Sequence, residues 1–274
     1  MEIIKSILFG IIEGITEWLP ISSTGHLILL NEFLKLDVSK NFYSMFEVVI
    51  QLGAIMAVII LFWKKIFPFY KKNNQIKISK NIMSLWGKII VACVPAAIIG
   101  LLLDDWLDEH LYNGVVVSIA LIVYGIIFIV IESKNIGSRN VNNLSDISYK
   151  QALGIGGFQL LSLIPGTSRS GSTIIGGLIL GLERSVAAEF TFFLAIPVMF
   201  GASLLKMAKY VAKVGFNFSG MELAILGVGC IVSFIVSLFV IKFLINYIRK
   251  HDFKVFGWYR IILGIIVLLY FWLF

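Results

Sequence analysis

The chain has 274 residues, of which 59% are hydrophobic and only 14% charged, and its mean hydropathy is +0.95. This apolar content excludes a water-soluble globular domain as an account of the whole chain. The formal net charge is +7, yet the basic residues lie in short segments between apolar runs, which favours the positive-inside bias of membrane loops over a nucleic-acid surface. We therefore predict an all-α, polytopic membrane protein that forms one integral membrane domain over 1–274 and binds no nucleic acid.

Apolar stretches long enough to cross a membrane recur along the chain. A helix needs about 20 residues to span a hydrocarbon core of roughly 30 Å. In chain order, the sequence predicts an interrupted apolar stretch at 6–34, full spans at 43–63, 86–103 and 114–132, a second interrupted stretch at 151–182, and full spans at 187–206, 222–245 and 256–274. The expected fold has about six transmembrane helices plus two broken helical segments.

Each interrupted stretch contains a proline followed by hydroxyl residues. Proline removes a backbone N–H and disturbs the preceding turn, so the freed backbone groups need protein or water rather than lipid tails. The first break has Pro20 before Ser22, Ser23 and Thr24, and the second has Pro165 before Thr167, Ser168, Arg169 and Ser170. We expect a re-entrant helix hairpin at each break.

The two halves of the chain share short sequence matches. Leu19, Pro20, Ser22 and Ser23 parallel Ile164, Pro165, Thr167 and Ser168, and Phe46 and Glu47 parallel Ala188 and Glu189 at similar distances downstream. An odd number of spans between the hairpins inverts the second relative to the first. We predict an inverted-topology repeat, with the first repeat at 1–135 and the second at 150–274, an arrangement that commonly puts a binding site near the midplane.

Charged residues between the spans predict the orientation of the chain. Segments 64–88, 133–150 and 246–257 are rich in Lys and Arg, as cytoplasmic loops are, whereas the expected loop at 104–113 carries Asp and Glu without Lys or Arg. The first hairpin then enters from outside and the second from the cytoplasm. Three lysines do not follow this bias: Lys206, Lys209 and Lys213.

Two glutamates in the first broken segment are candidate metal ligands. Glu13 and Glu17 are four residues apart on an expected helix, so their carboxylates share one face and repel each other unless a cation or a proton intervenes. Mg²⁺ and Ca²⁺ prefer such oxygen ligands. The alternative is a glutamate pair at a wet helix end. Cys93 and Cys230 lie in apolar runs without ligand spacing, so we expect neither a disulfide nor a zinc site.

The second break is suited to binding phosphate. Arg169 is a permanently charged bidentate donor, and the surrounding hydroxyls and glycines can approach phosphate oxygens. A helix that resumes near Ser170 would add the positive end of its dipole. The segment lacks the Gly-Lys-Ser/Thr ending of a Walker loop, and a solvated turn is the alternative. The candidate phosphate-binding hydroxyls here are Thr167, Ser168, Ser170 and Thr173.

The first break offers nucleophiles and a group for proton transfer. Ser22, Ser23 and Thr24 carry hydroxyls, and His26 carries an imidazole, a group whose reference pKa suits proton transfer. A structural hydrogen bond is the alternative role for His26. Downstream, Glu47 and Gln51 are candidates for supporting these hydroxyls and His26, and placement at a membrane end is the alternative for Glu47 and for Glu189.

Three long motifs together resemble one family. EGITEWLPISSTGH at 13–26, FEVVIQLGAI at 46–55 and PGTSRSGST at 165–173 are similar to the undecaprenyl-pyrophosphate phosphatase family, also known for bacitracin resistance, and the similarity extends through 94–103 and 190–202. The resemblance implies hydrolysis of undecaprenyl pyrophosphate to undecaprenyl phosphate and inorganic phosphate, which recycles the lipid carrier for cell-wall synthesis. It also implies a bacterial cytoplasmic membrane location and an active site open to the extracytoplasmic side.

The resemblance also implies roles for individual residues. Glu13 and Glu17 become the acidic pair that holds a divalent cation, Mg²⁺ or Ca²⁺, and Ser23 becomes the nucleophile with His26 as its assistant. Arg169, Ser168 and Thr173 contact the pyrophosphate. Either Glu17 or His26 could take the proton of Ser23, and a bound water could replace Ser23 as the attacking group.

A transporter or flippase of polyprenyl phosphate or another anion is the alternative function, because inverted re-entrant repeats also build transporters. The expected partners are the lipid pyrophosphate and the membrane lipids. The oligomeric state stays open. Phosphate release from the lipid pyrophosphate separates the two functions.

Overall fold

The computed structural model describes residues 1–111 and 113–273, with the side chains of all of these except 104, 105, 108 and 273. Six of the described helical segments are long and apolar enough to cross a membrane. They are Lys40–Leu61, Lys80–Leu103, Gly114–Ser133, Arg184–Val214, Gly220–Ile248 and Lys254–Trp272. The predicted all-α, polytopic class is confirmed.

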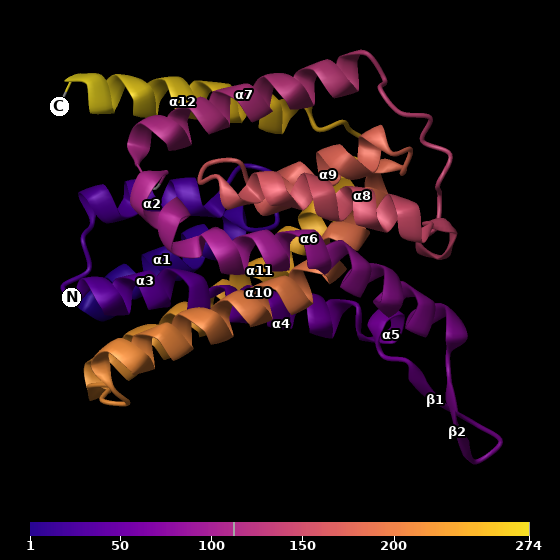
Figure 1. Cartoon of the computed structure of the whole chain (residues 1–274), viewed down its shortest axis with the longest axis horizontal. Helices are drawn as coiled ribbons and strands as arrows, with labels where there is room; N and C mark the ends of the chain where they lie inside the picture. Colours follow the sequence, from indigo (N-terminus) through magenta and orange to yellow (C-terminus); the bar gives the residue numbers. More distant parts are fainter. Residues whose placement is uncertain (112, 274) are drawn as a thin grey trace.

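The bundle consists of helices that run roughly side by side, with one small β hairpin (Figure 1). The helices are α1 (Glu2–Thr16), α2 (Ser23–Phe33), α3 (Lys40–Val49), α4 (Gln51–Leu61), α5 (Trp63–Ile66), α6 (Lys80–His110), α7 (Gly114–Ser133), α8 (Tyr149–Gln159), α9 (Arg169–Ile179), α10 (Arg184–Val214), α11 (Gly220–Ile248) and α12 (Lys254–Leu273). Two short 3₁₀ helices, η1 (Leu144–Asp146) and η2 (Leu160–Leu163), and the strands β1 (Phe69–Lys72) and β2 (Gln75–Ile78) complete the described elements.

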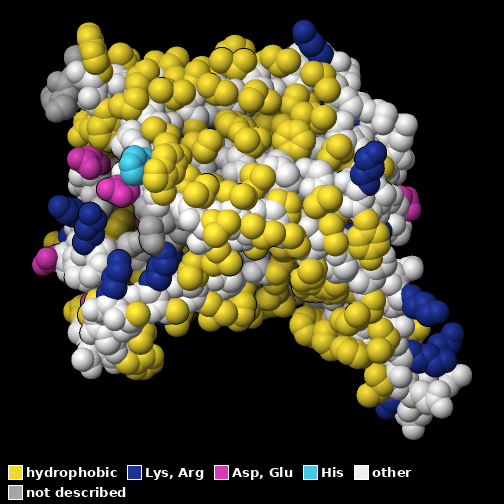
Figure 2. Space-filling view, in the orientation of Figure 1, with side chains coloured by type: hydrophobic (Ala, Val, Ile, Leu, Met, Phe, Trp, Pro, Cys, Tyr) yellow, Lys and Arg dark blue, Asp and Glu magenta, His cyan; other side chains and the backbone are white. Residues whose placement is uncertain are grey.

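Hydrophobic side chains cover most of the face in Figure 2, whereas Lys and Arg side chains gather towards its two ends. Large apolar side chains on the membrane-length helices are exposed, such as Leu102, Phe239 and Ile266. Their exposure to water would be costly, so a lipid environment accounts for it. The start of α1 and the end of α12 lie at one end of the bundle, and the β hairpin lies at the other (Figure 1).

Three predicted boundaries differ from the structure. The span at 43–63 is two helices, α3 and α4, which meet at Ile50. The expected loop at 104–113 is wrong, because α6 continues to His110; the side chains of the acidic residues Asp104, Asp105 and Asp108 lie outside the described residues. Residues 64–88 include the unpredicted hairpin β1–β2, which turns through Asn73 and Asn74 at φ 51° and 59°. Asparagine tolerates this left-handed backbone, which a two-residue hairpin turn requires.

Helices from the two halves of the chain pack closely where glycine lets the backbones approach. A Cβ on Gly14 of α1 would lie 2.8 Å from the carbonyl oxygen of Ser233 in α11. A Cβ on Gly156 of α8 would lie 2.3 Å from the carbonyl oxygen of Ala92 in α6. Such contacts are how helices associate where lipid offers no hydrophobic driving force. The first helix of each broken segment, α1 or α8, therefore packs on a long helix of the other half.

A buried carboxylate ties together the helices at the end of the bundle opposite the chain termini. Glu132 in α7 is 3% exposed and forms ion pairs of 2.7 Å with Arg139 and Arg184, and its Oε1 accepts the backbone N–H of Phe253. Several hydrogen bonds to a charged acceptor offset the cost of burying it. The contacts fix the starts of α10 and α12 against the end of α7.

Both proline-containing breaks occur where they were predicted, and α2 and α9 begin in the same way. Ser22 and Ser168 are the N-cap residues, with φ 76° and 73°, and their hydroxyls accept the backbone N–H of Gly25 and Gly171. The N-caps make Ser22 equivalent to Ser168, whereas the sequence match had aligned Ser22 with Thr167, one residue earlier. Matching caps and a matching order of helices support the inverted repeats 1–135 and 150–274, and the re-entrant path of the hairpins, which we keep as proposals.

Candidate active site

The starts of α2 and α9 meet at a cavity of about 160 Å³. Both broken segments, α4 and α10 contribute to its wall. The candidate residues that line it are Glu17, Ser22, Ser23, Thr24, Gln51, Ser168 and Arg169. Because helix N-termini carry unpaired N–H groups and the positive end of the helix dipole, two of them at one cavity favour an anionic ligand.

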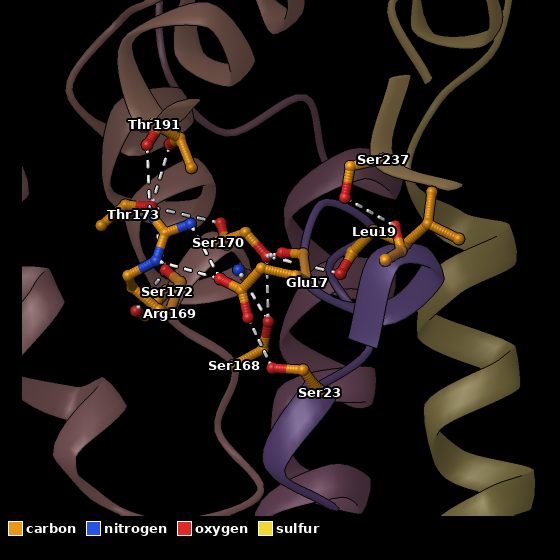
Figure 3. A network of polar contacts seen from close by, with 12 residues as sticks. Glu17, Leu19, Ser23, Ser168, Arg169, Ser170, Ser172, Thr173, Thr191 and Ser237 are labelled. Atoms are coloured by element: carbon orange, nitrogen blue, oxygen red, sulfur yellow. Dashed lines mark hydrogen bonds and ion pairs between the residues drawn. The ribbon is translucent and has the colours of Figure 1, made fainter. Parts of the chain in front are cut away.

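Glu17 links the two breaks (Figure 3). It is the residue after α1 and is 4% exposed. Its Oε2 accepts a hydrogen bond from the Ser23 hydroxyl, with an O–O distance of 2.6 Å. Its Oε1 accepts hydrogen bonds from Nη2 and Nε of Arg169, with N–O distances of 3.0 and 3.3 Å. The carboxylate therefore holds a hydroxyl on one oxygen and a guanidinium on the other, so it can accept a proton from Ser23 while Arg169 stabilises its charge.

Two threonines that hydrogen-bond to each other, Thr173 and Thr191, hold Arg169 in place through their carbonyl and hydroxyl groups. Its Nη1 donates to the carbonyl oxygen of Thr191 at 3.1 Å, and the Thr191 hydroxyl donates to Oγ1 of Thr173 at 2.9 Å. The hydroxyl of Thr173 donates back to the carbonyl oxygen of Arg169 within α9 (Figure 3). Thr173 is fully buried and supports Arg169, and it is not among the residues that line the cavity.

The other predicted phosphate-binding hydroxyls of the second break either line the cavity or are buried behind its wall. Ser170 donates to the carbonyl oxygens of Glu17 and Leu19 at 3.0 and 3.3 Å, so it joins α9 to the first break. Thr167 is fully buried, whereas Ser168 lines the cavity and its Oγ is 3.2 Å from that of Ser170. Of the four hydroxyls, only Ser168 is at the cavity wall.

Glu13 lies one turn before Glu17, wholly buried. It interacts electrostatically with Glu17, Glu47 and Arg169, and apart from a contact with the Glu17 carboxylate its oxygens accept no hydrogen bond from the described residues. Two adjacent buried carboxylates fit a shared proton or a hard cation such as Mg²⁺ or Ca²⁺. Within the described residues, no group of three or more His, Cys, Asp or Glu is arranged to hold a metal, so phosphate or water oxygens would complete the coordination.

Both ring nitrogens of His26 bond to groups other than the Ser23 hydroxyl. Its Nδ1 is 2.7 Å from the carbonyl oxygen of Ser22, and its Nε2 is 2.7 Å from the hydroxyl of Tyr259, whose ring stacks on the imidazole. A carbonyl can only accept, so Nδ1 carries the proton and Nε2 accepts from Tyr259. The imidazole thus fixes the N-cap of α2, and Glu17 is the group in contact with Ser23.

Sequence reasoning missed two residues of α12, Tyr259 and Arg260. Arg260 is fully buried and donates to the carbonyl oxygens of Pro20, Gly166 and Thr167 at 3.1, 2.9 and 2.9 Å. An arginine within an apolar span is itself a signal of function, and it was available in the predicted span at 256–274. Tyr259 carried no comparable signal, because tyrosine is common at membrane interfaces.

Comparison with known proteins identifies the family of the chain. The sequence profile of the family described as bacitracin resistance protein BacA matches residues 6–266. The chain belongs to the BacA family. An undecaprenyl-diphosphatase of Enterococcus faecalis is 60% identical over 271 residues, which cover 98% of this chain and 97% of the relative. An undecaprenyl-diphosphatase of Acetivibrio thermocellus is 56% identical over 272 residues, which cover 99% and 98% of the two chains.

BacA membership confirms the family resemblance read from 13–26, 46–55 and 165–173. The structure brings these three motifs together. The first supplies Glu17 and Ser23, the second supplies Gln51 to the cavity wall and Glu47 beside Glu13, and the third supplies Arg169. Residues far apart in this BacA-family sequence thus form one polar site between apolar helices.

Proposed function

We propose that this membrane protein is an undecaprenyl-diphosphatase whose chemistry takes place at the cavity between α2 and α9. The observation that carries the proposal is the 2.6 Å hydrogen bond from Ser23 to Glu17, beside the guanidinium of Arg169. A nucleophile, a base in contact with it and a fixed cation are the parts that phosphoryl transfer needs. The close similarity to undecaprenyl-diphosphatases supports the lipid diphosphate as the substrate.

In the reaction that we propose, Oγ of Ser23 attacks the terminal phosphorus and gives its proton to Oε2 of Glu17. The bond from that phosphorus to the bridging oxygen breaks, and undecaprenyl phosphate leaves with the electron pair. Water then hydrolyses the phosphoserine, releases inorganic phosphate and restores the hydroxyl. Glu17 is favoured as the base over His26, because His26 contacts the Ser22 carbonyl and Tyr259 instead.

Positive charge at the cavity wall would stabilise the phosphate oxygens. Arg169 brings a permanent charge, and the N-termini of α2 and α9 add their dipoles. Glu13 and Glu17 would hold a divalent cation, which supplies further neutralisation of the diphosphate when it is bound. Fixed charges of this kind act strongly in a site surrounded by apolar helices, where the dielectric constant is low.

An apolar cavity of about 380 Å³ continues from the polar one and supports a path for the lipid tail. It lies between α6, η2 and α10, and it shares Ser162, Val198 and Ala202 with the polar cavity. Apolar side chains such as Leu101 and Leu205 line it. The first isoprene units could occupy this cavity while the diphosphate stays beside Arg169, so the rest of the tail remains in the membrane.

Protein reconstituted in lipid vesicles tests the function directly. With undecaprenyl diphosphate it releases one phosphate per lipid and leaves undecaprenyl phosphate, and Arg169→Ala abolishes both products. Arg249→Ala is the control, because Arg249 is exposed beyond the end of α11. Full phosphate release by Arg169→Ala would remove this cavity as the site, and movement of intact diphosphate without release would establish a transporter instead.

We also propose that the cavity opens to the extracytoplasmic side of a bacterial cytoplasmic membrane. The lysines around β1–β2 and the basic residues at 133–150 and 246–257 support a cytoplasmic location for that end of the bundle. In a Cys93→Ala, Cys230→Ala background, Asn74→Cys should be labelled only from the cytoplasm and Ser219→Cys only from outside. Labelling of both from one side contradicts this orientation.

A further inference from the structure

Arg260 contacts both broken segments at the point where each turns into a helix. Nη1 donates to Pro20 at 3.1 Å, and Nη2 donates to Gly166 and Thr167, each at 2.9 Å. Pro20 lies two residues before the N-cap of α2, and Gly166 and Thr167 are the two residues before the N-cap of α9. One side chain of α12 thus joins the first and second breaks.

The two N-cap serines have an unfavourable backbone. Ser22 and Ser168 have φ 76° and 73°, in the left-handed region that residues with a Cβ rarely adopt. Such conformations persist only where the surrounding structure imposes them, and they occur often at functional sites. The carbonyl of Thr167 belongs to the peptide unit that precedes Ser168, so the bond from Arg260 restrains the rotation that sets the φ of Ser168.

Arginine is the side chain that can make these contacts. Its planar guanidinium offers several N–H donors in a fixed arrangement, whereas a lysine ammonium is a single point at the end of a flexible stem. Within the described residues, the charged end of Arg260 contacts only carbonyl oxygens and the ring of Tyr124, at 5.7 Å, and no ion pair to a carboxylate is present. A buried arginine without an acidic partner is costly, so a purely stabilising role explains it poorly.

We propose that Arg260 is a positioning residue that holds the segments leading into both strained N-caps, and through them keeps Ser23 and Arg169 in register across the cavity. The kinetic test of this inference rests on the proposed function, whereas the structural test by hydrogen exchange does not. Ser23 is the first residue of α2 and Arg169 is the first residue of α9, so each directly follows a strained serine. Release of either N-cap separates the nucleophile from the cation that acts with it.

The structural test uses amide hydrogen exchange on the whole protein in detergent. Arg260→Lys should raise exchange in both 20–25 and 165–172, and leave α6 and α11 protected. Arg184→Lys is the matched control, because Arg184 is paired with Glu132 away from the cavity, and it should leave both segments protected. Faster exchange in one segment, in neither, or throughout the bundle overturns the proposal.

The kinetic test measures phosphate release from undecaprenyl diphosphate. Misplacement of reacting groups by about 1 Å can cost roughly 100-fold in rate, so Arg260→Lys should lower kcat about 100-fold. KM should change less than about threefold, because the groups that bind the substrate are still present. A change in KM alone contradicts a positioning role. If the wild-type protein releases no phosphate, the proposed function fails, and the exchange experiment still decides the role of Arg260.

A double-mutant cycle identifies how Arg260 acts. Glycine adopts positive φ without strain and is tolerated at an N-cap, so Ser168→Gly removes the need to restrain that residue. Arg260→Lys should therefore cost about tenfold less kcat in the Ser168→Gly protein than in the wild type, a coupling that independent residues do not show. Equal costs in the two backgrounds would show that Arg260 does not act through the strained serine.

Discussion

Arg169 and Glu17 are 152 positions apart in the chain, yet Nη2 of the arginine lies 3.0 Å from Oε1 of the glutamate. Ser23 donates to the other carboxylate oxygen. The ion pair and the hydrogen bond define the reacting side of the cavity, and each member of the group can be removed separately.

Glu17→Gln should lower kcat by about 10²–10⁴, the range that a positioned general base contributes. The amide keeps the size of the side chain but cannot take the proton of Ser23. Phosphate release under saturating lipid diphosphate measures the loss. Glu189→Gln, which breaks an ion pair with Lys65, is the control and should keep wild-type turnover. Activity of Glu17→Gln near that of the wild type would exclude Glu17 as the base.

Ser23→Ala should lower kcat at least ~100-fold, because covalent catalysis through the serine is lost. Ser118→Ala is matched to it, since Ser118 is also buried and donates only to a carbonyl of its own helix. Acid quenching during turnover of diphosphate labelled at the terminal phosphate should trap labelled wild-type protein. An unlabelled protein, or a Ser23→Ala variant with full turnover, would assign the attack to water.

A chelator should abolish phosphate release, and Mg²⁺ or Ca²⁺ should restore it. Glu13→Gln should raise the cation concentration needed for half-maximal activity by about 10-fold or more, since one charged oxygen ligand is lost. Cation binding to the protein without lipid, followed by calorimetry, separates this effect from catalysis. Unchanged activity in the chelator would show that the glutamate pair does not hold a required ion.

Tyr259→Phe should reduce kcat by about tenfold, which corresponds to one lost hydrogen bond of roughly 1.4 kcal/mol. His26→Ala should reduce it further, because the imidazole also holds the Ser22 carbonyl. The double variant should be no worse than His26→Ala, since the two residues act through one contact. Additive losses would show that His26 and Tyr259 have separate roles.

Gly53→Ala should destabilise the bundle by about 1–3 kcal/mol, the usual cost of overpacking. A Cβ at this position would lie 2.1 Å from the carbonyl oxygen of Cys230, so α4 and α11 must separate. Gly227→Ala is the control in α11, where no atom lies within 4 Å of the added carbon. Thermal unfolding in one detergent compares the two, and equal midpoints would contradict the close packing of α4 on α11.

Apolar length and proline position were enough to predict the spans and both breaks, because lipid strongly restricts which backbone can cross it. The identity of the site residues followed from charge in apolar sequence, which singled out Glu13, Glu17 and Arg169. Helical spacing could not show which face of α9 meets the cavity. Ser170 and Thr173 therefore looked like phosphate ligands, although Ser170 bonds to the first break and Thr173 supports Arg169.

Other parts of the site depended on contacts between distant helices. The sequence suggested His26 as an assistant to Ser23 because the two are close in the chain, but its ring is held by Tyr259 of α12. Arg260 carried the signal of a charge in an apolar span, but its role depends on three acceptors that lie in two other segments. No spacing within one segment encodes a contact of this kind.

The dependence of both breaks on α12 also bears on how the protein is made. During synthesis, the segments that carry Glu17, Ser23 and Arg169 enter the membrane before Arg260 leaves the ribosome. Until then the three carbonyl groups that Arg260 will bind have no such donor, and the two serine caps are not yet restrained. If Arg260 positions the two breaks as proposed, we expect a nascent chain that ends at α11 to be inserted but inactive, and hydrolysis to begin only after α12 has been made.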